Sequence, residues 1–294
     1  MIRFELKKIF VKKSVWILVG VCLVLQIIFS MRINTALPEG FRDDIYRYYT
    51  QQIEGRFSTE KRDFMRTEYE QMVELLSREN EYRDQFYDHE LSADEYKELS
   101  DQIKSADTRK VTVEYLCAKG DYYSTLEEPV EYFYDIAVTD YVESWSLNFF
   151  AILSVIMMIT VLALEDENCN TVYMVRSSRN GRKRLFRLRM ILAGVLSLGV
   201  SLLFYLAEYV TKLLYFDMGN LSAPLNSLMA FAGGAGEMAI GTYIVRMIMI
   251  SVAASGVLGI LTMLVGVLTK KNIVTYIIML GAAYLLHLCT QFIL

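Results

Sequence analysis

The chain has 294 residues, of which 54% are hydrophobic and 22% are charged, and its formal net charge is −4. Residues of both kinds are abundant, so they must be segregated, and several windows of about 17–22 residues carry almost no charge, which is long enough for a helix to cross a bilayer. This composition excludes an ordinary soluble globular protein. It predicts an all-α integral membrane protein with about five transmembrane helices and a polar insert.

The N-terminal residues predict a membrane anchor whose N-terminus lies in the cytoplasm. Residues 1–13 form an amphipathic pattern, with apolar side chains on one helical face and several lysines elsewhere, as in a helix lying on the cytoplasmic membrane surface. The first span is predicted at residues 14–31. Because no small-residue cleavage pattern follows it, we interpret it as a retained signal anchor rather than a removed leader.

Residues 32–144 are predicted to be an extracytoplasmic helical domain. The segment holds about 27 acidic and about 14 basic side chains, so its net charge is about −13 and the rest of the chain is basic by about +9. Lysine and arginine in short loops orient a membrane protein with those loops inside. The basic remainder therefore places the acidic insert outside and the N-terminus in the cytoplasm.

Local patterns predict helices within this insert. An apolar stripe of Met65, Tyr69, Met72 and Leu76 predicts a helix over about 59–87. The capping-box sequence beginning at Ser92 predicts a helix toward Ser105, and a further short element is predicted to end near Gly120. Many tyrosines could be core and membrane-interface residues or a ligand surface: Tyr46, Tyr48, Tyr49, Tyr122, Tyr123, Tyr132, Tyr134 and Tyr141.

A helix beginning at Pro129 is predicted to continue into the second span at residues 145–164. The loop at 165–189 then opens with an acidic cluster, continues with a short apolar helix, and turns at Asn180-Gly181 into a dense basic run. Such a basic loop belongs on the cytoplasmic side. We expect this loop to carry the function.

The C-terminal half alternates spans and loops. The predicted elements are a third span at 190–215, an outer loop at 216–243, a fourth span at 244–268, an inner loop at 269–272 and a fifth span at 273–294. Glu208 and Lys212 lie one helical turn apart and are predicted to form an ion pair at the outer interface, with a transport role as the alternative.

Small residues recur every four positions in two of the spans: Ser197 and Ser201 in the third, and Ser251, Ser255 and Gly259 in the fourth. Such faces let helices approach closely. They predict packing within the bundle, and a dimer seam is the alternative.

The sequence contains few residue patterns that are typical of catalytic or metal sites. The two histidines, His89 and His287, are far apart, and no hydrolase, metalloprotease or phosphate-loop pattern appears. The cysteines do not form a disulfide framework, and His287 with Cys289 is an ordinary packing pair more often than a metal site. We therefore predict no enzyme activity, no metal, no cofactor on this chain and no nucleic-acid partner.

The 165–189 loop resembles the loop after the second span in permease subunits of bacterial ATP-binding-cassette exporters of the type-two class. Matching positions are the acidic cluster, the Thr171 step, the apolar helix, Ser177 and Gly181-Arg182, while Asn170 replaces a usual Gly and Arg179 a usual Pro. The lysine-rich N-terminus and the large insert after the first span also resemble that family, although its members have about six spans.

This resemblance implies a coupling role for the loop. Its helix would dock on a separate ATPase subunit, which would hold the ATP and Mg, and a second permease copy or homologue would complete the exporter in the bacterial plasma membrane. The implied coupling residues are Glu165, Asp166, Glu167, Thr171, Val172, Val175, Arg176, Ser177, Arg179, Gly181 and Arg182. Alternatively, the basic loop binds only anionic lipid headgroups.

Two other functions stay open at this stage. One is a non-transporting membrane scaffold or sensor whose extracytoplasmic domain binds a peptide or an envelope component. The other, more distant, is an integral membrane enzyme that acts on lipid. The sequence does not identify a substrate, nor does it distinguish a homodimer from a heterodimer.

Overall fold

The computed structural model describes the chain at residues 5, 7, 10–127, 129–143, 148–168, 181–231 and 238–293. Side chains of residues 165–168, 181–182 and 286–293 lie outside that description. The chain divides into two compact units. The bundle unit comprises residues 1–33, 144–216 and 244–294, and the polar unit comprises residues 34–143 and 217–243.

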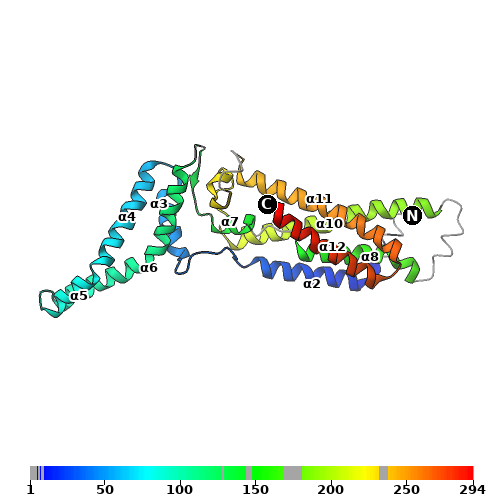
Figure 1. Ribbon diagram of the computed structural model, residues 1–294. Coiled ribbons are helices and arrows are strands. Elements are labelled where there is room, and N and C mark those ends of the chain that lie inside the picture. Colours follow the sequence, from blue (N-terminus) through cyan, green and yellow to red (C-terminus); the bar gives the residue numbers. More distant parts are fainter. Residues whose placement is uncertain are drawn as a thin grey trace. The chain divides into compact units, whose positions relative to one another are not determined.

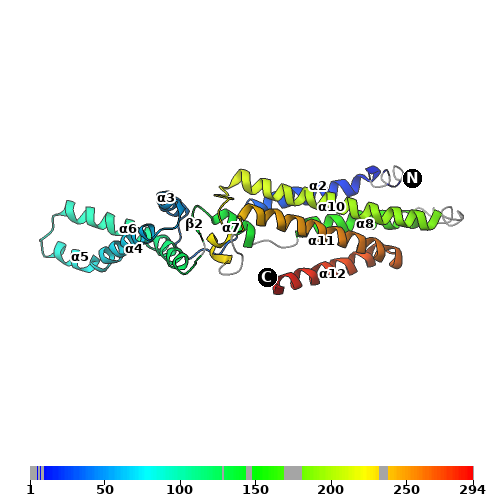
Figure 2. The same ribbon diagram turned by 90° about the horizontal axis from the view of Figure 1, so that it is seen from above.

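Long apolar helices make up the bundle unit, and Figures 1 and 2 show them side by side. They are α2 (Lys13–Ser30), α8 (Phe149–Asn168), α10 (Gly181–Tyr215), α11 (Ile240–Thr269) and α12 (Asn272–Ile293). Helices α2, α10 and α11 are long and apolar enough to cross a bilayer, which indicates a multi-pass membrane protein. The apolar helices Phe149–Leu164 and Asn272–Leu285, as far as their side chains are described, are shorter.

Helix α8 is the central element of the bundle unit. It packs against α2, α10 and α12, and its residues Val155, Ile156 and Ile159 are completely buried. One apolar cluster joins α8 to α2 and α10, and a second joins it to α11 and α12. A helix that is hydrophobic on all sides is stable when its whole surface is covered, which explains the charge-free sequence of α8 up to Leu164.

Helices also dominate the polar unit. They are α3 (Asp43–Ile53), α4 (Thr59–Ser77), α5 (Glu79–Tyr87), α6 (Ala93–Ser124) and α7 (Ile136–Glu143), with the 3-10 turns η1 (Leu225–Ser227) and η2 (Met229–Phe231). Two short antiparallel strands, β1 (Gly55–Arg56) and β2 (Glu131–Tyr132), pair Gly55 with Tyr132. The packing of α4 against α6 is the main helix contact of this unit.

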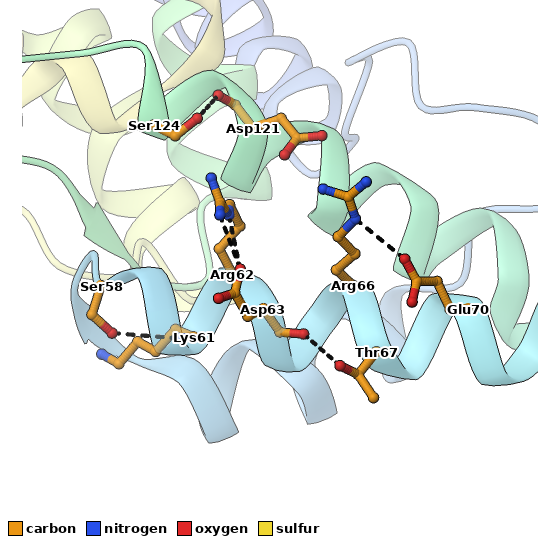
Figure 3. Close-up of polar contacts among 9 residues, drawn as sticks. All are labelled: Ser58, Lys61, Arg62, Asp63, Arg66, Thr67, Glu70, Asp121 and Ser124. Carbon is orange, nitrogen blue, oxygen red and sulfur yellow. Dashed lines mark hydrogen bonds and ion pairs between the residues drawn. The ribbon is translucent and has the colours of Figure 1, made fainter.

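Polar contacts within α4 and within α6 accompany their packing, and Figure 3 shows these contacts where the two helices lie close together. Ser58 caps α4, because its hydroxyl oxygen accepts a hydrogen bond of 3.3 Å from the backbone N–H of Lys61. No Cβ fits at Gly120 of α6, since it would come within 2.6 Å of the Tyr132 hydroxyl and 3.1 Å of the Arg62 side chain. A glycine at this position therefore permits the close approach of α4 and β2 to α6.

The predicted helix over 59–87 is divided in two. Met65 and Met72 of the predicted stripe are buried, which confirms its core face. Helix α4 nevertheless ends at Ser77, whose hydroxyl donates a hydrogen bond of 2.7 Å to the Glu74 carbonyl, and Arg78 leaves helical geometry with φ −91° and ψ 4°. Local side-chain bonds of this kind compete with the helix.

The capping box at Ser92 is confirmed, with both reciprocal hydrogen bonds to Glu95 present. The helix that it begins does not end near Ser105. It continues to Ser124 as α6, so the two elements predicted before Gly120 are one. The sequence lacks a Pro or Gly between Ser105 and Gly120, and burial of Val113 and Leu116 stabilises the longer helix.

The predicted helix from Pro129 into the second span is wrong. Residues 131–132 form β2, the backbone N–H of Phe57 donates a 2.9 Å hydrogen bond to the carbonyl of Val130, and α7 begins only at Ile136. Pairing with the chain around β1 holds this stretch extended. Trp145, predicted at the start of the second span, lies outside the described residues.

A buried ion pair lies at the centre of the polar unit. The Lys119 ammonium donates to the Asp135 carboxylate at 2.7 Å and to the Tyr46 hydroxyl at 3.0 Å, and Tyr46 donates to the other Asp135 oxygen at 2.6 Å. Lys119 is completely buried, with rings of Tyr46, Tyr123 and Phe133 near its ammonium. Burial, and then the Asp135 charge, raise the pKa of Tyr46 well above its ordinary value.

The segment after α10 belongs to the polar unit, although it was predicted as a separate outer loop. Tyr123 donates a 2.6 Å hydrogen bond to the Ser227 carbonyl, and the Ser227 hydroxyl accepts one of 3.0 Å from the backbone N–H of Glu131. Asn220 donates to the Glu131 carboxylate at 2.9 Å. Gly219 has φ +60° and no room for a Cβ against the Tyr134 carbonyl, so the sequence there must be glycine.

The tyrosines of the insert are mainly core residues. The buried members are Tyr46, Tyr49, Tyr123, Tyr132 and Tyr141, whereas Tyr48 is exposed. The hydroxyls of Tyr46, Tyr49 and Tyr123 donate hydrogen bonds within the unit, whereas the buried Tyr132 hydroxyl has no hydrogen-bond partner among the described residues. This arrangement favours the core interpretation over a tyrosine-lined ligand surface.

Candidate functional site

The predicted coupling loop joins α8 to α10, two helices that pack against each other. Glu165, Asp166 and Glu167 fall in the last turn of α8, and Gly181 and Arg182 open α10. The intervening residues 169–180 lie outside the described residues, and they include the predicted coupling positions Thr171, Val172, Val175, Arg176, Ser177 and Arg179. The structure thus defines the two helix ends from which the loop is held.

Helix α10 carries the basic end of this segment into the bundle without a break. It has 35 residues and is therefore about 52 Å long at 1.5 Å per residue, against about 30 Å for a bilayer core. The predicted third span began at Met190, but α10 begins at Gly181. Exposed Lys183, Arg184 and Arg187 precede the apolar part, so the basic end and the apolar part belong to one continuous helix.

Near this basic end, α10 makes a buried ion pair with the N-terminal segment. The Arg189 Nε lies 2.8 Å from the Glu5 carboxylate oxygen. Glu5 is only 2% exposed and Arg189 only 6%. The two residues are 184 positions apart, so no local pattern predicts their pairing, although Glu5 is a lone acid in a lysine-rich segment. Both the N-terminal segment and the predicted coupling loop are thus connected to α10.

The N-terminal segment also contacts α2. Residues 5, 7, 10 and 11 are helical, Lys12 is not, and α2 begins at Lys13. Phe10 stacks on Trp16 across this break, with ring centroids 5.1 Å apart. The described residues of this segment are thus helical, and the non-helical Lys12 and the aromatic stack join them to α2.

The small-residue faces bring α10 and α11 together. A Cβ at Gly259 would overlap the Ser197 hydroxyl, so this glycine permits the close approach of the two helices. Ser197, Ser251 and Ser255 are buried, and each hydroxyl donates to a backbone carbonyl one turn earlier. Ser201 is also buried. These residues lie inside one bundle unit, and a role in a dimer seam stays a prediction.

A polar cluster occupies the other end of α10. The backbone N–H of Asn148, just before α8, donates a hydrogen bond of 3.1 Å to the Tyr205 hydroxyl. Its amide donates to Glu208 at 2.9 Å. Lys212 donates to the Arg32 carbonyl at 2.6 Å. These contacts fix α8 and the end of α2 on α10, and the pairing of Glu208 with Lys212 stays a prediction.

An open groove of about 670 Å³ lies in the polar unit. Its lining comes mainly from one face of α6 and comprises Leu75, Asp94, Lys97, Glu98, Asp101, Gln102, Ser105 and Arg109. The neighbouring α5 contains no buried residue. The groove is therefore a mixed polar surface with three acidic and two basic side chains.

The described residues provide little support for a reactive thiol or a metal site. Burial, with the charge of Asp121 next, raises the pKa of the Cys117 thiol to about 11. Cys117 is half-buried, and its thiol donates to the Met65 carbonyl at 3.3 Å, so it is an unreactive structural thiol. Among the residues that the structure describes, no group of His, Cys, Asp and Glu side chains is arranged to hold a metal ion.

Comparison of the chain with protein-family models, with curated proteins and with solved structures found no match.

Proposed function

We propose that this chain is the membrane-spanning permease subunit of an ABC-type exporter, which couples ATP hydrolysis on a separate ATPase subunit to substrate export across a bacterial plasma membrane. The observation that supports it best is the continuity of α10. One unbroken helix extends from the end of the proposed coupling loop, through a run of exposed basic residues, to the buried contacts with α8 and α11.

The proposed topology has five spans, namely α2, α8, α10, α11 and α12, with the N-terminus in the cytoplasm and the polar unit outside. Its support is the charge distribution. Lysines and arginines gather before α2, at the start of α10 and between α11 and α12 at Lys270-Lys271, and basic short loops face the cytoplasm. The acidic insert lies between α2 and α8, as an outer domain would.

In the proposed mechanism the loop at 169–180 docks on the ATPase. Arginines of the loop pair with acidic groups of that partner, since arginine forms strong charge-assisted hydrogen bonds with carboxylates. Closure of two ATPases on ATP moves the loop, and α8 and α10 carry the movement into the bundle. A second permease copy or homologue completes the pathway, and all cofactor chemistry takes place on the partner.

Co-purification tests this proposal. Replacing residues 171–182 by a Gly-Ser linker of equal length removes the docking helix, whereas replacing Lys270-Lys271 by Ser-Ser removes charge from another proposed inner loop and serves as the matched control. We expect an ATPase to purify with the wild type and the control in mild detergent and to be lost from the linker variant. An ATPase that stays bound to the linker variant would refute the coupling role.

A second experiment tests the topology. Cys117 is a poor reporter of sidedness because it is half-buried and its pKa is raised. Tyr87 is 70% exposed in the polar unit, so Tyr87→Cys in a Cys117→Ser background supplies a better one. An impermeant maleimide applied to intact cells should label position 87 and spare Cys169. The opposite pattern would invert the model.

The scaffold or sensor function is the second candidate, and the open polar groove of the polar unit, with its three carboxylates, is the observation that favours it. Such a protein would bind a cationic peptide through Asp94, Glu98 and Asp101 without an ATPase. Peptide binding by the full chain in detergent that falls with salt and with Asp101→Asn, together with the absence of any co-purifying ATPase, would favour this function over export. The full chain is needed because residues 217–231 complete the polar unit.

A further inference from the structure

The Glu5–Arg189 ion pair is unusual because it is buried. Both side chains are more than nine-tenths buried, at 2% and 6% exposure, with 2.8 Å between Nε and the carboxylate oxygen. Burying two charges removes their hydration, so such a pair adds little net stability compared with an apolar contact of the same size. In some proteins a buried polar group instead fixes the register between the elements that it joins.

The N-terminal helix and the start of α10, which carry the two residues, lie next to the proposed coupling loop in the chain or are joined to it through α10. Arg189 is eight residues from the start of α10, or about 12 Å along the helix axis, and that start follows directly on the proposed coupling loop. Glu5 belongs to the short N-terminal helix, which is separated from α2 by the non-helical Lys12. Phe10 of that helix also stacks on Trp16 of α2, and the chain joins the two at Lys12.

We propose that the Glu5–Arg189 pair is a latch that holds the N-terminal helix on α10, so that this helix and the basic end of α10 move together. A displacement delivered at residues 169–180 then reaches the N-terminal helix as well as α10. Glu5 and Arg189 are positioning residues in this scheme, because neither contacts a substrate. The latch itself is a property of this chain alone, whereas its use in coupling rests on the proposed function.

The first test examines the latch in the purified chain. A bimane fluorophore is attached at Val11→Cys, which is 64% exposed in the wild type, in a chain whose four native cysteines are serine. Trp16 quenches bimane by contact, and Trp16→Phe defines the unquenched signal. We expect Glu5→Gln and Arg189→Gln to change the quenching, because the N-terminal helix then leaves its fixed position against α2.

Two further variants make this result specific. The exchange Glu5→Arg with Arg189→Glu should restore the wild-type quenching, because it rebuilds the pair with its charges reversed. Arg187→Gln removes an exposed charge two residues away and should change nothing. Elution as a single species in detergent shows that each variant is folded. Unchanged quenching in both single variants would overturn the latch.

The second test adds the ATPase and MgATP to the labelled chain. In the wild type we expect MgATP to change the bimane quenching, and in Glu5→Gln we expect this response to be lost while the ATPase stays bound. An equal response in both proteins would refute the role of the latch in coupling. If no ATPase binds the wild type, the proposed function fails, and the first test alone still decides whether the latch exists.

Discussion

Replacing Lys119 tests how the polar unit is held together. Lys119→Met removes the ammonium that contacts both Asp135 and Tyr46, at 2.7 and 3.0 Å. Asp135 is 3% exposed and would keep only the 2.6 Å hydrogen bond from Tyr46 among these contacts. The carboxylate would then be buried without its positive partner.

The expected loss follows from that geometry. Leaving one member of a buried ion pair uncompensated costs about 3–5 kcal/mol of unfolding free energy. For a unit of this size each kcal/mol corresponds to about 2–4 °C, so the melting temperature should fall by about 10 °C. Replacing all three groups, as Lys119→Met, Asp135→Leu and Tyr46→Phe, removes the unpaired charge and should restore stability to within about 2 kcal/mol of the wild type.

Cys117 provides the assay. Its thiol is half-buried against the Met65 carbonyl, so it becomes reactive when the polar unit unfolds. In a chain whose other cysteines are serine, a fluorogenic maleimide followed during heating reports this unit separately from the bundle. Lys104→Met, an exposed change on the same helix, is the control and should lie within about 0.5 kcal/mol of the wild type.

Two results would refute this reasoning. One is a Lys119→Met protein that melts within about 3 °C of the wild type. This result would mean that other groups stabilise the Asp135 carboxylate without the Lys119 ammonium. The other is a triple variant as unstable as the single one, which would mean that packing of the lysine stem, rather than its charge, holds the unit together.

Three further predictions concern other parts of the chain. Because the folded state raises the pKa of Tyr46 above its ordinary value, its stabilising contribution is complete below about pH 10 and is lost as the pH rises further, so Tyr46→Phe should flatten the alkaline decline of the melting temperature measured by circular dichroism. Gly259→Leu should destabilise the bundle by about 1–3 kcal/mol in detergent melts because it overlaps Ser197, whereas Gly281→Leu, with no atom within 4 Å of its Cβ position, should not. Cys117, with a pKa of about 11, should react with maleimide at pH 8 about 100-fold more slowly than a free cysteine, and an equal rate would show that the thiol is not buried.

Local signals in the sequence identified the elements that depend on neighbouring residues. The apolar windows correspond to α2, α8, α10, α11 and α12 because a charge-free stretch of that length has few alternatives to a helix. The capping box at Ser92 began α6 where predicted, since its hydrogen bonds join residues only three apart. Where partners are distant, prediction failed: the stretch after Pro129 becomes a strand because it pairs with β1, some 75 residues earlier.

The residues of the candidate site also differ in whether local sequence patterns reveal them. The basic run before Met190 and the small-residue face around Gly259 can be recognised from their spacing alone. The Glu5–Arg189 pair and the Lys119–Asp135 pair cannot, because the chain contains many acidic and basic residues and nothing local indicates which will meet. The assignment of coupling residues between Thr171 and Arg179 is a prediction that rests on resemblance in the sequence.

By itself the sequence determined that this protein is helical, apolar over most of its length and divided by charge into a membrane part and an acidic part. The tertiary structure decided that residues 217–231 complete the acidic unit, that α8 is the covered centre of the bundle, and that the N-terminal helix is held to α10. The physical reason is that helix formation and segregation by hydrophobicity depend on short stretches of chain. A buried charge, by contrast, is stable only beside a partner that folding brings to it.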